Sequence, residues 1–318
     1  MRLHRFTCTM KVLNPLLILL QRSHLPRRDT PTMKVFSVGL LSIALGVTSC
    51  ASPAEVSQPT QEPLERPLEL QAEIISRHDF DSRSFTQGLE MDGDSLIVGT
   101  GGYGTSSIYR TSVDNIQTTR KQLPDSFFGE GITVTKTDPT KDSSRKIWQL
   151  TWKNNVAIQR DPESLEETAR ATYPGEGWGL CAFSDRLIMS DGTSSLRVLD
   201  PLTFEEIKRI SVRVSNAQGQ AIPVEGLNEL ECVPAGSGAQ TDTVYANKFL
   251  STEILGIDVT SGVVRERIDA SPIPNNAQPD IDNVLNGIAH IPGTDNFYIT
   301  GKRWPDLYRV RFLQRVSP

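Results

Sequence analysis

The segment Gly129-Glu130-Gly131-Ile132-Thr133 is one of five copies of a short phrase in which a strand opens on a polar or aromatic residue. The other copies are Thr86-Gln87-Gly88-Leu89-Glu90, Gly177-Trp178-Gly179-Leu180-Cys181, Leu227-Asn228-Glu229-Leu230-Glu231 and Leu285-Asn286-Gly287-Ile288-Ala289. The equivalent positions Gln87, Glu130, Trp178, Asn228 and Asn286 are 43, 48, 50 and 58 residues apart. Such periods with short strands are typical of a β-propeller. The sequence therefore predicts an all-β fold, a five-bladed β-propeller of four-stranded antiparallel blades. The five equivalent residues, here called the repeat heads, are expected to meet at one axis.

Alternating apolar and polar residues indicate further strands within each repeat. Second strands are expected at residues 95–100, 146–152, 186–191, 243–247 and 296–300. Third strands are expected at residues 107–113, 156–159, 195–199, 253–259 and 307–312. Residues 68–77 precede the first repeat and are expected to supply the outer strand of the last blade, which closes the ring and leaves few open edges.

Residues 33–50 have the pattern of a secretory signal, with a basic start, an uncharged apolar middle and small residues at the end. The last four, Val47-Thr48-Ser49-Cys50, resemble a bacterial lipobox, which predicts cleavage before Cys50 and lipid attachment to its thiol. The alternative is a plain hydrophobic leader that is cleaved nearby. Either way the protein is expected to be exported. The lipobox places it in the periplasm or on the outer membrane, with membrane contact only through the lipid anchor.

The signal divides the chain into four parts. Residues 1–32 are expected to be an upstream or misassigned start, because a second plausible initiator, Met33, follows them. Residues 51–67, rich in Pro, Gln, Glu and Ser, are expected to be a disordered linker. Residues 68–318 then form the propeller domain, which is expected to be a monomer.

The charge balance argues against a nucleic-acid partner. Residues 1–50 hold seven Lys or Arg and one acidic residue, so the rest of the chain carries 26 basic and 37 acidic residues and a net charge of −11. A surface with this excess of carboxylates repels a phosphate backbone. No run after the signal approaches the roughly 18 apolar residues of a membrane-spanning helix.

Cofactor and metal motifs are weak. Residues 99–104 read Gly-Thr-Gly-Gly-Tyr-Gly, the dinucleotide-binding pattern, but a strand and not a helix is expected after them, so these glycines serve a turn. Zinc is disfavoured because only His78 and His290 lie beyond the signal and Cys181 and Cys232 have no CxxC companion. The two cysteines either form a disulfide or stay as buried thiols, since a sequence does not supply their Cα separation.

Glu130 is the only repeat head that ionises near neutral pH. Phe127 and Phe128 precede it, and a carboxylate among aromatic side chains is desolvated, which raises its pKa toward the range useful for proton transfer. The alternative is that Glu130 only accepts backbone hydrogen bonds at a strand start. The nearby aromatic residues could likewise be pocket walls or core; they are Phe85, Trp152, Trp178, Phe249 and Trp304.

Several motifs follow one another in an order that is specific as a set. They are Phe85-Thr86-Gln87-Gly88-Leu89, Gly-Thr-Gly-x-Tyr-Gly-x-Ser-Ser over residues 99–107, Phe128-Gly129-Glu130-Gly131-Ile132-Thr133, Gly175-Glu176-Gly177-Trp178-Gly179-Leu180, Ser190-Asp191-Gly192-Thr193, Leu227-Asn228-Glu229-Leu230-Glu231, Tyr245-Ala246-Asn247, Val284-Leu285-Asn286-Gly287-Ile288-Ala289 and Thr300-Gly301-Lys302-Arg303-Trp304-Pro305. The set covers residues 75–310 and resembles the plant and bacterial glutaminyl-peptide cyclotransferases. The resemblance implies a five-bladed propeller enzyme, an acyltransferase that converts the N-terminal glutamine of peptides or proteins to pyroglutamate and releases ammonia.

The resemblance also implies roles for individual residues. Glu130 would be the proton shuttle between the attacking α-amine and the departing ammonia. The residues implied to hold the carboxamide and its developing oxyanion are Gln87, Asn228 and Lys302. The residues implied to wall the pocket are Phe85, Phe128, Trp152, Trp178 and Phe249. Phe249 stands where the family usually has tryptophan. Gly102 stands where the family has a larger apolar residue, and Arg303, after Lys302, replaces another.

Cofactor use follows from the same resemblance: catalysis is expected to need no metal or other cofactor, while a structural calcium ion is left open. The expected partners are peptides or proteins with N-terminal glutamine. The first alternative is a catalytically silent propeller lipoprotein that serves as a peptide-binding scaffold. The second is a metal-dependent propeller lactonase or sugar dehydrogenase, which chelators would inactivate.

Overall fold

The computed structural model describes residues 63–136, 138, 140–141 and 144–315. Every helix or strand element in these residues is a β-strand, so the predicted all-β class is confirmed. Within them the chain offers no helix that could span a lipid bilayer. The predicted start over residues 1–32 and the predicted signal over residues 33–50, with the candidate lipid-attachment residue Cys50, lie outside the described residues.

Three sheets each consist of four consecutive antiparallel strands. The first contains β2 (Thr86–Asp92), β3 (Ser95–Thr100), β4 (Ser107–Thr111) and β5 (Gln117–Gln122). The second contains β6 (Gly129–Lys136), β7 (Arg145–Thr151), β8 (Val156–Arg160) and β9 (Glu167–Thr172). The third contains β10 (Leu180–Ala182), β11 (Leu187–Met189), β12 (Ser195–Leu199) and β13 (Glu206–Ser211). The residues 101–106 with their glycines connect β3 to β4 as a turn, as predicted.

The largest sheet joins two further antiparallel sets of four strands. One set is β16 (Leu227–Val233), β17 (Thr243–Lys248), β18 (Glu253–Asp258) and β19 (Val263–Asp269). The other is β20 (Leu285–His290), β21 (Asn296–Gly301), β22 (Asp306–Gln314) and β1 (Leu68–Asp79). Parallel pairing of β1 with β19 joins the sets. Because β1 pairs antiparallel with β22 on the outside of the last set, the predicted closing strand is confirmed.

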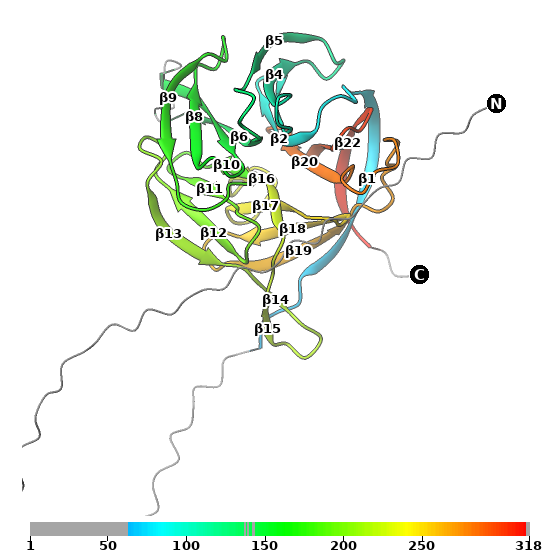
Figure 1. Ribbon diagram of the computed structural model, residues 1–318. Helices are drawn as coiled ribbons and strands as arrows, with labels where there is room; N and C mark the ends of the chain where they lie inside the picture. The colour runs from blue at the N-terminus through cyan, green and yellow to red at the C-terminus, as the bar shows by residue number, and fades with distance from the viewer. Residues whose placement is uncertain (1–62, 137, 139, 142–143, 316–318) are drawn as a thin grey trace, which may run out of the picture. The chain divides into compact units, whose positions relative to one another are not determined.

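The first strands of the sets are neighbours in a closed ring. Strand β2 contacts β6 and β20, β6 contacts β10, and β16 contacts both β10 and β20. Figure 1 shows these strands nearest the common centre, while β5, β9, β13, β19 and β1 lie outermost. All repeat heads predicted from the sequence therefore lie on or just before strands that surround one axis.

β-Bulges set the repeat heads apart from the rest of their strands. In the first strands β2, β6, β16 and β20 the pairing register shifts at the head, so that Gln87, Glu130, Asn228 and Asn286 have no partner in the adjacent strand. A bulge bends a strand and re-aims a side chain. The heads are therefore released from the regular alternation of the sheet, which is why polar side chains at these positions reach the centre.

Glycines after the heads let neighbouring first strands approach closely. A Cβ atom on Gly131 would lie 2.6 Å from the backbone nitrogen of Leu180, and one on Gly179 would overlap the carbonyl oxygen of Asn228. The Gly131 N–H instead donates to the carbonyl oxygen of Trp178 at 2.7 Å. Glycine is thus required at these positions by the backbone of the next set, not by a turn.

Apolar side chains fill the spaces between adjacent sheets, and a disulfide bond crosses one of these spaces. Cys181 on β10 and Cys232 on β16 form a disulfide with a Cα–Cα distance of 5.3 Å, which decides between the two alternatives that the sequence left open. The bond closes a loop with a sequence separation of 51 residues. Constraining a loop of this size in the unfolded chain contributes about 4 kcal/mol to stability.

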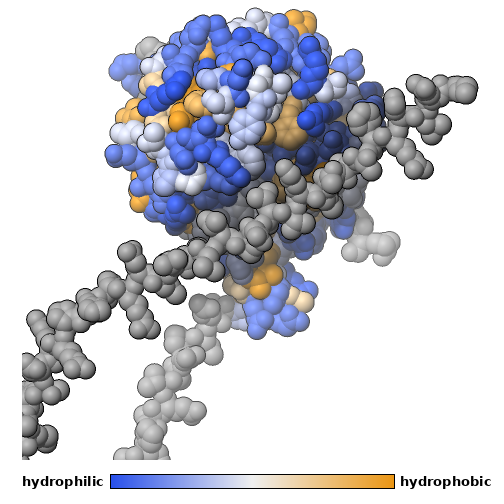
Figure 2. Space-filling model, viewed as in Figure 1, coloured by the Kyte–Doolittle hydropathy of each residue, from blue (hydrophilic) through white to orange (hydrophobic). Residues whose placement is uncertain are grey.

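A hairpin that the repeat pattern did not predict extends from the sheets. It consists of β14 (Arg213–Ser215) and β15 (Ala221–Pro223), and Arg213 pairs with Val263, the first residue of β19. Residues 63–67, predicted as the end of a disordered linker, contact it: the Leu64 N–H donates to the Gly219 carbonyl oxygen at 3.0 Å. Figure 2 shows a mostly hydrophilic surface, on which hydrophobic residues form small separate groups, one of them on this hairpin.

Candidate active site

A cavity of about 290 Å³ lies at the end of the axis where the repeat heads gather. The residues that line it are Phe85, Gln87, Phe128, Glu130, Trp152, Trp178, Asn228, Phe249, Asp282 and Lys302. The structure thus brings together every predicted site residue in its described part, although their chemical roles stay predictions. Asp282 was not predicted, because it lies in the irregular segment between β19 and β20 and belongs to no repeat.

A second hollow, of about 480 Å³, lies where β2 and β6 end. Three of its charged side chains form ion pairs with one another: Arg110 Nη2 lies 2.7 Å from Asp92 Oδ2, and Arg145 also pairs with Asp92. These ion pairs already satisfy the carboxylate of Asp92. We therefore place the candidate active site in the smaller, aromatic cavity.

Glu130 is the most deeply enclosed acid of the cavity, with 4% of the residue exposed. Its Oε1 accepts a hydrogen bond from Gln87 Nε2 at 3.0 Å. Its Oε2 is buried and has no hydrogen-bond partner in the described part of the chain. Burial raises the pKa of Glu130 well above its ordinary value, and the nearby charge of Lys302 opposes this shift. The carboxyl group is thus suited to accept and release a proton, with one oxygen available to a ligand.

Asn286, a repeat head with no predicted site role, orients the Gln87 side chain. Its Nδ2 donates to Gln87 Oε1 at 3.0 Å and to the Thr86 carbonyl oxygen at 3.0 Å. Since Asn286 occupies the carbonyl side of the Gln87 amide, the NH₂ group of Gln87 faces Glu130. The side chain of Asn286 is completely buried, so this orientation is held in the interior of the ring.

Lys302 brings a cation into the same cavity. The residue is 5% exposed, and its Nζ lies 4.9 Å from the ring centre of Phe85 and 5.3 Å from that of Phe249. Burial lowers the pKa of Lys302, while the negative charge of Glu130 opposes this change. The aromatic faces offset part of the lost hydration of the ammonium group.

Aromatic rings wall the cavity in edge-to-face contacts. Phe128 meets Phe85 with a centroid distance of 6.0 Å and Trp152 at 5.5 Å, and Trp178 meets Phe249 at 5.4 Å. All five rings are partly exposed, in contrast to Trp304, which is 3% exposed and packs in the core near Tyr308. Phe85, Phe128, Trp152, Trp178 and Phe249 therefore line the cavity, whereas Trp304 belongs to the core.

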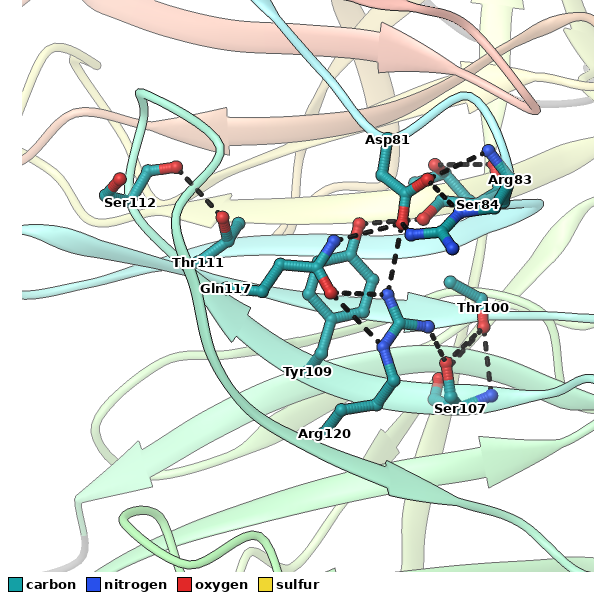
Figure 3. A network of polar contacts seen from close by, with 11 residues as sticks. Asp81, Arg83, Ser84, Thr100, Ser107, Tyr109, Thr111, Ser112, Gln117 and Arg120 are labelled. Carbon is teal, nitrogen blue, oxygen red and sulfur yellow. Dashed lines mark hydrogen bonds and ion pairs between the residues drawn. The ribbon is translucent and has the colours of Figure 1, made fainter.

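The segment that leads to Phe85 is fastened by a polar network around Asp81 (Figure 3). The side chains that donate to its carboxylate are those of Arg83, Gln117 and Arg120, at 2.9, 3.0 and 3.2 Å. Burial would raise the pKa of Asp81, but the hydrogen bonds from Arg83 and Gln117 outweigh it and lower the pKa to about 2. Ser84 shares a hydrogen bond of 2.7 Å with the Tyr109 hydroxyl. The residues before Phe85 thus have a rigid support.

The sequence disfavours zinc and leaves a structural calcium ion open. In residues 63–136, 138, 140–141 and 144–315 no group of three or more His, Cys, Asp and Glu is arranged to hold a metal ion. His290 contacts the Thr294 carbonyl oxygen at 2.8 Å, and His78 lies 2.9 Å from the Ser76 hydroxyl. Both histidines are therefore engaged in local hydrogen bonds away from the cavity.

Comparisons with known proteins give a consistent result. Residues 41–312 match the family model described as glutamine cyclotransferase. A glutaminyl-peptide cyclotransferase of Arabidopsis thaliana is 30% identical over 250 residues, which cover 76% of this chain and 71% of the plant protein. The crystal structure of a glutaminyl cyclase of Myxococcus xanthus superposes with a TM-score of 0.67 at 30% identity and covers 79% of this chain and 100% of that structure.

Proposed function

The chain belongs to the glutamine cyclotransferase family, and from this membership we propose that it is a glutaminyl-peptide cyclotransferase. It would act as an acyltransferase that converts the N-terminal glutamine of peptides or proteins to pyroglutamate. The observation that carries the proposal is the position of Glu130, a buried carboxyl group with one oxygen lacking a partner in the described residues, inside a cavity walled by aromatic rings.

The proposed reaction is a ring closure within one residue. The α-nitrogen of the substrate attacks the carbon of its own side-chain carboxamide, and a new C–N bond closes a five-membered ring. The bond to the carboxamide nitrogen breaks, and one proton passes from the attacking to the leaving nitrogen, which departs as ammonia. Since both reacting groups are already joined, the enzyme must mainly hold the folded side chain, exclude water and move a proton.

The residues that line the cavity would perform these three tasks. Glu130 Oε2 would accept the proton from the α-nitrogen and return it to the departing nitrogen. Lys302 and Asn228 would donate to the carboxamide oxygen as its negative charge develops, which is the form of stabilisation that most favours acyl transfer. Gln87, held by Asn286, would keep the carboxyl group of Glu130 in place. The aromatic walls would exclude water.

We propose further that catalysis needs no metal or other cofactor, because the side chains above already provide a proton carrier and oxyanion donors. The exported location, the lipid on Cys50 and the monomeric state remain proposals that rest on the sequence. A mass spectrum of the mature N-terminus would test the first two.

Ammonia release tests the function directly. With a Gln-initiated dipeptide amide, the protein is expected to release one ammonia per pyroglutamyl product, and in the mass spectrum the product is expected to be lighter than the substrate by the mass of one NH₃ molecule. Rates are expected to be unchanged by chelators. Binding of the peptide without ammonia would favour the scaffold alternative, and loss of activity on chelation would favour a metal-dependent propeller enzyme.

Removal of the Trp178 ring tests whether the aromatic side chains of the cavity bind the substrate. Trp178→Ala is expected to raise KM for a Gln-initiated peptide about 10- to 100-fold, because a partly buried aromatic contact is worth about 1–3 kcal/mol. Initial-rate kinetics and direct binding measure it. The matched control is Phe127→Ala, which removes a nearby ring that does not line the cavity. Unchanged substrate affinity in Trp178→Ala would show that this ring lines the cavity without contacting the substrate.

A further inference from the structure

Two tryptophans of the cavity depend on one carboxylate oxygen. Trp152 follows β7 and Trp178 precedes β10, so the rings come from different sheets. Trp152 Nε1 donates to Glu176 Oε2 at 2.7 Å, and Trp178 Nε1 donates to the same oxygen at 3.0 Å. Hydrogen bonds to an ionised acceptor are about twice as strong as those between neutral groups. Glu176 therefore joins two tryptophan side chains that come from different sheets.

Glu176 is itself held in place. Lys153 Nζ lies 3.5 Å from Glu176 Oε1 and 3.9 Å from the ring centre of Trp152. The backbone is tied to the same region, since the Gly177 N–H donates to the Trp152 carbonyl oxygen at 3.1 Å. Partial burial would raise the pKa of Glu176, but the hydrogen bonds from Trp178 and Trp152 outweigh it and lower the pKa, so the group is ionised at neutral pH.

The charge of Glu176 also acts on the proposed proton shuttle. After burial and the opposing effect of Lys302, its negative charge is the next influence, and it raises the pKa of Glu130. Other groups near Glu130 are the amide of Gln87, which donates to it, Tyr173, on which it acts electrostatically, and Asp282, which lines the same cavity. Removing the charge at residue 176 would thus lower the pKa of Glu130 without touching its contacts.

We infer that Glu176 is a positioning residue of the cavity: its carboxylate fixes the rings of Trp152 and Trp178 in the orientation that receives the substrate glutamine. This inference rests on the proposed function and adds a residue to it. Glu176 lies in the motif Gly175-Glu176-Gly177-Trp178 but is not itself among the residues that line the cavity. The competing interpretation is a surface ion pair with Lys153, which would contribute little.

The first test uses kinetics. Glu176→Ala is expected to raise KM about tenfold, and Glu176→Gln, which keeps an acceptor oxygen, is expected to recover part of this loss. Both variants are expected to move the acid limb of the pH profile of kcat/KM to lower pH, because removal of a negative charge lowers the pKa of Glu130. The control is Glu166→Gln, which breaks a surface ion pair with Lys121, and neither of these residues lines the cavity. Unaltered KM and pH profile would overturn the inference.

The second test asks whether Glu176 acts through the indole N–H groups. Phenylalanine at 152 and 178 keeps two aromatic walls without the donors, so Glu176→Ala is expected to have little further effect in the Trp152→Phe/Trp178→Phe background. A full additional rise in KM there would contradict the proposed link.

A third measurement does not depend on activity. The near-ultraviolet circular dichroism of tryptophan is expected to weaken in Glu176→Ala and not in Glu166→Gln, because free rings lose their fixed orientation. An unchanged spectrum would overturn the inference even in an active enzyme. If the wild-type protein instead released no ammonia from any glutaminyl peptide, the proposed function would fail, whereas a weakened spectrum would still show that Glu176 holds the rings.

Discussion

Replacement of Glu130 by glutamine is expected to lower kcat for a Gln-initiated peptide by about 10²–10⁴-fold, the usual contribution of a positioned general acid or base. An amide has nearly the same shape as the carboxyl group, so the cavity is expected to keep its form and KM is expected to change little. The amide cannot carry a proton between two nitrogens at neutral pH. The substitution is therefore expected to lower kcat and to leave KM nearly unchanged, and the rate of ammonia release at saturating substrate measures kcat.

The controls for this variant separate chemistry from folding. Glu205→Gln changes an exposed glutamate in the β12–β13 turn and is expected to keep the wild-type rate. Substrate binding to Glu130→Gln, measured by calorimetry, is expected to persist without product. Near-normal turnover in Glu130→Gln would show that another group moves the proton.

The position of Glu130 could be predicted because a repeat carries it. The five copies place a head residue at one point in each first strand, and strands of a closed ring must meet at its centre. The β-bulges at the repeat heads were not predicted, because a register shift depends on the sequences of both paired strands. They leave four heads without a partner in the adjacent strand: Gln87, Glu130, Asn228 and Asn286. Phe249 and Lys302, outside the repeated phrase, were identified by the family resemblance.

Other features depend on distances that a sequence does not contain. The disulfide was left open until the Cα separation of Cys181 and Cys232 was known. Asp282 and Glu176 were missed because they lie on irregular segments, where no periodicity says which way a side chain points. The parallel pairing of β1 with β19 was also missed, since it is made by strand backbones whose residues alternate only weakly.

One repeat departs from the rest at the position after its head. Four copies have glycine there, at residues 88, 131, 179 and 287, whereas the copy at residues 227–231 has Glu229. This side chain is 1% exposed and crosses to two other first strands. Its Oε1 accepts from the Leu89 N–H on β2 at 3.2 Å, and its Oε2 accepts from the Ile288 N–H on β20 at 2.8 Å. Glu229 thus satisfies backbone donors that face the centre of the ring.

Glu229→Ala is expected to lower the free energy of unfolding by about 3 kcal/mol, because two buried N–H groups lose their acceptor and each such loss costs about 1–3 kcal/mol. For a domain of this size the melting temperature should fall by about 6–12 °C. Denaturant unfolding with the disulfide intact measures the change. Glu205→Ala, which removes an exposed carboxylate, is expected to stay within about 0.5 kcal/mol of the wild type.

The pH dependence of this difference tests which form of Glu229 stabilises the ring. Burial raises the pKa of Glu229 well above its ordinary value, against the opposing hydrogen bonds from Leu89 and Ile288. A carboxyl group whose pKa is higher in the folded state contributes stability that is complete below its unfolded pKa of about 4.3 and is lost as the pH rises through the folded value. The difference between wild type and Glu229→Ala is therefore expected to be largest in acid and to shrink as the pH rises. A difference that grows with pH would show that the ionised carboxylate is the stabilising form.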